Sequence, residues 1–197
     1  MIKHFLCCAA LAVLTLLCSS CATAPSPPLA AGGFSGGAGG SDIITRGTGF
    51  RFPARIGPFI RAGTRLYDAA GQDLSVKYLA GALAVADVYE YPTRGKSLAT
   101  EFVDRKDEVR FYHSDARLLH EGEVTIHPGG KVRRGRKARF AVSEGYNYSF
   151  PPPYQSDLLV FQNGQRFIEY RFTYSAAHRE RVQSEIDKFF DALAWPE

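Results

Sequence analysis

A strand–turn–strand pattern close to the C-terminus constrains the fold more than any other part of the chain. Residues 158–162 and 165–174 are rich in β-branched and aromatic side chains, and Asn163-Gly164 stands between them. Asn-Gly is a strong signal for a two-residue hairpin turn, which here places Phe161 opposite Arg166. Alternate residues share a face, and one face is fully apolar: Leu159, Phe161, Ile168, Tyr170, Phe172 and Tyr174. The pattern predicts an antiparallel sheet with one apolar and one mixed face.

Further strands are expected upstream of this hairpin, because short runs of alternating polarity are bounded there by turn residues. The expected strands cover 59–67, 74–79, 83–91, 131–134 and 137–143. A turn at Gly135 separates the last two of them, and Pro92 ends the third.

Two helices complete the pattern. Ser97 is a residue type that caps helix N-termini, and a helix from there to a stop at Gly122 is expected from apolar residues spaced by three, four or seven: Leu98, Phe102, Val109, Tyr112, Ala116 and Leu119. Ser175 begins a second helix that buries Val182, Ile186, Phe189 and Leu193. This order predicts the α+β class, a layered sandwich of a mostly antiparallel sheet with a long central helix and a C-terminal helix.

The C-terminal part also resembles a known group. The stretch Leu158–Arg171, then Thr173-Tyr174, the last helix and Leu193-Ala194-Trp195 resemble the PsbP/DcrB-like α/β sandwich, whose members show a strand pair, an aromatic-basic second strand and a helix ending in tryptophan. The resemblance implies a fold. It carries no functional residue over, because the group includes binding and accessory proteins as well as uncharacterised lipoproteins.

Residues 1–20 have the order of a secretory signal peptide. Lys3-His4 precede an apolar run from Phe5 to Leu17, and Cys18-Ser19-Ser20 follow it. The apolar run is short for a transmembrane helix. All four cysteines of the chain, Cys7, Cys8, Cys18 and Cys21, lie in this region. The sequence after Cys21 therefore offers no disulfide, cysteine metal ligand or thiol nucleophile.

A signal of this kind that ends in small residues before a cysteine resembles the bacterial lipoprotein class. In that class the cysteine, here Cys21, becomes the first residue of the mature protein and is acylated, with palmitate among its acyl groups. Ala22 follows Cys21, and by resemblance to enterobacterial sorting this residue favours the outer membrane, facing the periplasm. Simple cleavage of the signal without acylation is the alternative.

The domain organisation follows from composition. Residues 1–20 are expected to be the signal peptide and 21–45 a lipidated, disordered linker, because that range is rich in proline and glycine. Residues 46–197 are long enough for one α+β domain.

Six positive charges stand within nine residues: Lys131, Arg133, Arg134, Arg136, Lys137 and Arg139. One interpretation is a solvated turn around Gly135 that protects a sheet edge from further strand pairing. The other is an anion-binding loop for an anionic lipid, lipopolysaccharide or an acidic envelope protein. The formal net charge of the whole chain, +4, is too small to indicate nucleic acid.

We find no pattern in the sequence that predicts catalytic residues, cofactor-binding residues or metal ligands. His113 and His120 are seven residues apart, whereas helical zinc ligands stand three or four apart. We therefore expect a membrane-anchored envelope lipoprotein with a non-enzymatic binding or accessory role. The alternative is a periplasmic hydrolase with a site assembled from distant residues. A closed polar pocket with two shifted pKa values would favour the enzyme, and an open aromatic or basic surface would favour the binding protein.

The first prediction concerns the anchor. Cys21→Ser should move the protein from the membrane fraction to the soluble periplasm, because acyl chains supply roughly 0.8 kcal/mol of membrane affinity per buried CH₂. Fractionation of cells with a salt wash measures this. A mutant that stays membrane-bound after the wash would contradict lipidation at Cys21.

Overall fold

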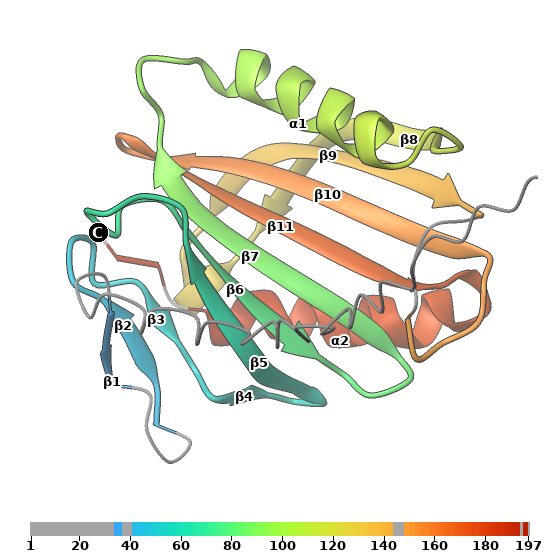
Figure 1. The fold of residues 1–197 in the computed structure, drawn as a ribbon, viewed down its shortest axis with the longest axis horizontal. Coiled ribbons are helices and arrows are strands. Elements are labelled where there is room, and N and C mark those ends of the chain that lie inside the picture. Colours follow the sequence, from blue (N-terminus) through green and yellow to red (C-terminus); the bar gives the residue numbers. More distant parts are fainter. Residues whose placement is uncertain (1–33, 37–40, 144–147, 194, 197) are drawn as a thin grey trace, which may run out of the picture.

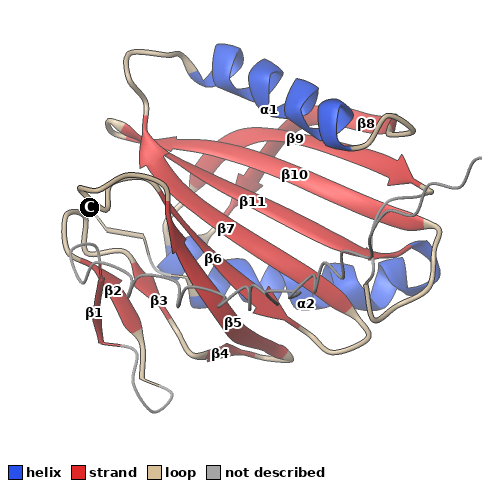
Figure 2. Cartoon of the chain, in the orientation of Figure 1, coloured by secondary structure: helices blue, strands red, loops and turns tan. Residues whose placement is uncertain are grey.

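The computed structural model describes residues 34–36, 41–143, 148–193 and 195–196. Cys21 and the predicted signal peptide lie outside the described residues. One large sheet separates helix α1 (Leu98–Tyr112) from helix α2 (Arg179–Ala192), as Figure 1 and Figure 2 show. The predicted α+β layered sandwich is therefore confirmed. No helix among the described residues is long and apolar enough to cross a membrane.

The large sheet has eight strands in the order β4-β5-β6-β7-β11-β10-β9-β8, and all neighbours are antiparallel. In chain order the strands are β4 (Arg55–Ile56), β5 (Phe59–Leu66), β6 (Leu74–Leu79), β7 (Ala84–Pro92), β8 (Arg117–Ile126), β9 (Arg133–Val142), β10 (Tyr154–Asn163) and β11 (Arg166–Ser175). A smaller sheet joins β1 (Phe34–Gly36), β2 (Ile43–Thr45) and β3 (Arg51–Phe52). Two 3₁₀ turns are η2 (Pro128–Gly130) and η3 (Ala176–His178).

The face under α2 holds the larger core. Phe189 of α2 lies edge-on to the rings of Phe59 and Phe172, with centroids 5.0 and 5.3 Å apart. Trp195 follows α2, and its Nε1 donates to the Tyr170 hydroxyl at 2.8 Å. Edge-to-face aromatic packing of this kind adds to the free energy of area burial. The predicted apolar face of the β10–β11 hairpin is thus confirmed, since all six of its residues belong to this core.

The register of that hairpin differs from the prediction by two residues. Phe161 pairs with Ile168 rather than with Arg166, and the two-residue loop consists of Gly164 and Gln165. Gly164 has a φ of 59°, a conformation that glycine adopts without steric cost. Because side chains alternate with a period of two, a shift of two residues keeps every side chain on its predicted face.

The predicted helix from Ser97 to Gly122 is correct at its start and wrong at its end. The Ser97 side chain accepts a hydrogen bond from the Thr100 amide and caps α1. The helix stops at Tyr112, and the backbone of His113 is no longer helical. Residues 117–126 form β8, which pairs with β9. The register of this pairing shifts between Leu118 and His120. Pairing with β9 overrides the helical spacing of the apolar residues there.

The predicted turn at Gly135 is also wrong. Gly135 lies within the continuous strand β9, where it pairs with Phe161 on one side and Val124 on the other. A Cβ at this position would collide with the Phe161 ring and the Val160 carbonyl. The glycine therefore serves close packing of a buried strand and does not form a turn.

The folded part also reaches further toward the N-terminus than residue 46. Strand β2 lies inside the range 21–45 that the sequence predicts as linker, and Ile43 and Thr45 are buried. The Thr45 hydroxyl accepts a hydrogen bond from the Phe50 amide at 2.9 Å, which closes the β2–β3 turn.

A second prediction follows from the packing of Gly135. Gly135→Ala should lower the free energy of unfolding by about 1–3 kcal/mol or more, the usual cost of overpacking a core. Gly63→Ala is the control, because a Cβ at Gly63 meets no atom within 4 Å, and it should change stability by less than about 0.5 kcal/mol. Denaturant unfolding measures both. If Gly135→Ala lowered the free energy of unfolding as little as Gly63→Ala does, the Phe161 ring would have to move aside freely.

Candidate functional site

A cleft lies between α1 and the strands β5, β6, β7 and β11, and we call it the α1 cleft. It consists of two cavities of about 400 and 590 Å³. They adjoin, because the same five residues line both: Arg65, Tyr67, Tyr89, Tyr112 and Arg171. The cleft exists because α1 packs on β9 and β10 and leaves β5 and β6 uncovered (Figure 1).

Strand alternation builds the floor of the cleft from polar residues. In one row across the sheet, Ser75 pairs with Arg65 and with Tyr89, and Tyr89 pairs with Glu169. In the next row, Asp87 pairs with Lys77 and with Arg171. Residues two apart on a strand share a face. The sheet face opposite the main core is therefore polar here, whereas under α1 it is apolar.

Tyrosines form the walls. The rings of Tyr67 and Tyr89 stack with centroids 6.4 Å apart, and the Tyr67 and Ser75 hydroxyls are hydrogen-bonded at 3.1 Å. The Arg171 guanidinium lies 5.3 Å from the centroid of the Tyr89 ring. Tyr112 stands on α1 and, like Tyr67, is exposed. The two exposed rings thus stand on opposite elements at a mouth that is open to solvent.

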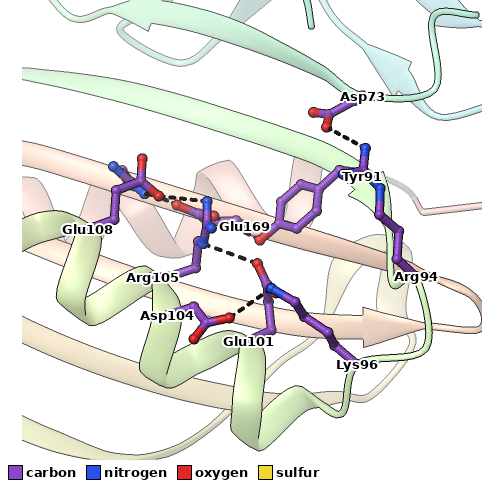
Figure 3. Close-up of polar contacts among 10 residues, drawn as sticks. Asp73, Tyr91, Arg94, Lys96, Glu101, Asp104, Arg105, Glu108 and Glu169 are labelled. Carbon is purple, nitrogen blue, oxygen red and sulfur yellow. Dashed lines mark hydrogen bonds and ion pairs between the residues drawn. The ribbon is translucent and has the colours of Figure 1, made fainter. Parts of the chain in front are cut away.

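A network of charges ties α1 to the floor (Figure 3). Buried Glu169 accepts a hydrogen bond from the Tyr91 hydroxyl at 2.9 Å and pairs with Arg171. Arg171 also pairs with Glu108 of α1 at 3.1 Å. Arg105, on the same helix, pairs with Glu108 at 2.6 Å and extends the network toward the helix start. Hydrogen-bonded ion pairs of this kind hold their side chains in fixed positions.

Two titratable groups in the smaller cavity have shifted pKa values. Burial raises the pKa of Asp87, and the opposing effects of Lys77 and Arg171 only partly offset it. Burial lowers the pKa of His113, although Asp115 acts in the opposite direction. Both residues line the same cavity. Desolvation therefore disfavours the charged form of each.

The six cations that the sequence offers as a candidate anion-binding loop do not lie on one loop. Five of them lie on β9 and alternate between the two faces of the sheet. Lys137 and Arg139 pair with the fully buried Asp157, at 2.9 and 2.5 Å. Arg136 pairs with Glu121 at 3.5 Å. Arg133 covers the Trp195 ring, Arg134 is exposed, and Lys131 precedes the strand. Most of these charges therefore hold the fold together.

Within residues 41–143, 148–193 and 195–196, the structure contains no group of three or more His, Cys, Asp or Glu that could hold a metal ion. His113 lines the α1 cleft, whereas His120 lies exposed on β8. The structure thus does not bring these two histidines to one site.

No local pattern in the sequence predicts the α1 cleft, but charged residues on its central strands are a signal for it. Asp87 interrupts the apolar alternation of β7, and Glu169 and Arg171 interrupt that of β11. Charged residues on strands that are central to a sheet need partners when they are buried. Their partners come from α1 and β6, which no local pattern connects to them.

Comparisons with known proteins give a likeness of fold only. No family model matches the chain, and no curated protein matches it. One similar solved structure is the crystal structure of a Pseudomonas aeruginosa protein of unknown function, with 9% identity, a TM-score of 0.44, and 84% of this chain and 99% of that chain covered. Another is the solution structure of cyanobacterial PsbP from Synechocystis sp. PCC 6803, with 13% identity, a TM-score of 0.46 and coverage of 84% and 94%.

A third prediction tests the desolvation of Asp87. Because burial raises its folded-state pKa above 3.8, the folded protein binds more protons than the unfolded chain between 3.8 and the raised value. Wild-type stability therefore falls as pH rises through that window, and the penalty is fully present at pH 7. Asp87→Asn should raise the Tm at pH 7, and this gain should disappear as the pH falls toward 3.8.

The control is Asp107→Asn, which changes an exposed carboxylate on α1 and should leave the Tm nearly unchanged. Thermal melts of both variants at pH 7 and at low pH make the comparison. A loss of stability in Asp87→Asn at pH 7 would show that the Lys77 and Arg171 pairings outweigh desolvation.

Proposed function

We propose that the chain is a membrane-anchored envelope lipoprotein whose folded domain binds a ligand in the α1 cleft without chemically changing it. The resemblance of residues 1–21 to lipoprotein signals supports the anchor and the envelope location. The observation that carries the binding role is the open, tyrosine-lined cleft beside α1.

The size and the lining of the cleft suit a small ligand. Small-molecule sites typically occupy about 300–1,000 Å³ and combine aromatic walls with a few fixed polar groups. The two cavities fall in that range, and Tyr67, Tyr89 and Tyr112 supply the walls. Tyrosine rings give large contact areas at a low cost in conformational entropy.

The charged groups of the cleft are held in place by ion pairs. Glu101, Glu108 and Glu169 each pair with an arginine of the same network. Carboxylates in hydrogen-bonded ion pairs of this kind are held in fixed positions. The network therefore pre-orders the site before a ligand enters.

One observation favours the alternative, a periplasmic hydrolase. Asp87 and His113 line one cavity with pKa values shifted toward each other by burial. Shifted pairs of this kind are typical of active sites. The open mouth weighs against this alternative, because catalytic acids and bases work best where water is excluded.

A fourth prediction tests binding with native material. A low-molecular-weight extract of the host cell envelope should raise the Tm of the purified full chain, because a ligand that binds only the folded state stabilises it, by about 2.7 kcal/mol at 100 times its Kd. The double variant Tyr67→Ser/Tyr112→Ser should lose the response. Both side chains are exposed, so the variant should still fold.

The matched control is Phe111→Ser, which removes an exposed ring next to Tyr112 that lines neither cavity. It should respond as the wild type does. An unchanged wild-type Tm, or an equal rise in the double variant, would refute binding in the cleft. Consumption of an extract component by the wild type but not by Asp87→Asn would replace the binding proposal with the hydrolase.

A further inference from the structure

Three ion pairs that line the α1 cleft are asymmetric. In each of the three the cation is more exposed than its acid: Lys77 is 53% exposed against 23% for Asp87, Arg94 68% against 26% for Asp73, and Lys96 44% against 4% for Glu101. In these pairs the acid lies toward the floor and the cation toward solvent. Exposed groups dominate the potential that an approaching ligand meets, so the mouth of the cleft is electropositive.

Arg65 adds a cation to this rim without a balancing acid. Its guanidinium lies 5.0 Å from the centroid of the exposed Tyr67 ring. Among the ion pairs of the described residues, none joins Arg65 to a carboxylate, and the residue lines both cavities. Arg65 pairs across the sheet with Ser75, and Lys77 lies two residues further along the same face. Diagonal neighbours of this kind are about 7–8 Å apart at the backbone, within reach of a common anion.

Aromatic rings line the same cavity as these two cations. Tyr67 is exposed and stacks on Tyr89, and Tyr112 faces the cleft from α1. Aromatic rings pack well against a second flat ring in an offset or edge-on arrangement. The rim therefore offers a surface for a ring and, next to it, two cations for a negative group.

We infer that the ligand of the α1 cleft is an anion that carries a flat ring, with the ring against Tyr67 and Tyr112 and the negative group between Arg65 and Lys77. This inference rests on the proposed binding function and specifies its ligand class. A purely apolar ligand would bring no negative group to Arg65, and a cationic ligand would meet four exposed positive charges: Arg65, Lys77, Arg94 and Lys96.

The fifth prediction uses two probes with the same ring and opposite charge. Naphthalene-2-sulfonate should bind the purified full chain, and 2-naphthylmethylammonium should bind on the order of tenfold more weakly or worse, since like charges repel it. Naphthalene fluorescence or titration calorimetry measures both. Raising the salt concentration should weaken sulfonate binding, because the rim cations are exposed to solvent.

Variants locate the site. Arg65→Gln/Lys77→Gln should weaken sulfonate binding by about tenfold and leave ammonium binding unchanged or improved. Arg134→Gln is the matched control, because it removes an exposed cation on β9 that lines neither cavity. Its affinity for the sulfonate should stay within about twofold of wild type.

The outcomes separate this inference from the binding function. Equal binding of both probes, with both lost in Tyr67→Ser/Tyr112→Ser, would overturn the anionic class and leave binding in the cleft intact. An equal loss of affinity in Arg134→Gln would overturn the inference by showing general surface attraction. Failure of both probes to bind would also overturn it, and the thermal shift with envelope extract would then decide the binding function separately.

Discussion

The pairing of β7 with β11 is the contact on which the rest of the structure depends. It joins the meander β4–β7 to the meander β8–β11 along nine residue pairs. Because β8 lies at the far edge of the sheet, the chain that leaves β7 must cross three strands before it can begin the second meander. Helix α1 makes that crossing, so its position over β9 and β10 follows from the strand order. The uncovered strip beside it becomes the cleft.

The two sides of the sheet have different compositions and different roles. The α2 side is one continuous apolar core, rich in aromatic rings, whose residues are stabilised by packing against one another. The α1 side combines a smaller apolar cluster with a charged network around Glu169 and Arg171. Burying charges costs free energy that ion pairing only partly offsets, and well-packed apolar residues would often be at least as stable. Departures from the most stable packing are expected at functional sites.

Local patterns in the sequence were sufficient to predict those elements whose partners are close along the chain. The strand 74–79 has its predicted bounds, and both faces of the β10–β11 hairpin are correct because an alternation of two survives a register shift of two. The predicted end of α1 and the predicted turn at Gly135 were wrong, since both features depend on the partners of β9 rather than on local spacing. The cleft could not be predicted, because Arg65, Asp87, Glu108 and Arg171 meet only after the two meanders pair.

The position of Trp195 has a practical consequence for following the two layers of the molecule. It is the only tryptophan of the chain, and it is buried against Tyr170 where the segment after α2 meets the sheet. Its emission therefore reports whether the C-terminal helix is docked. The tyrosines of the cleft lie on the opposite face of the sheet. The indole signal, recorded on an unmodified sample, can thus follow loosening of the α2 layer separately from changes in the cleft.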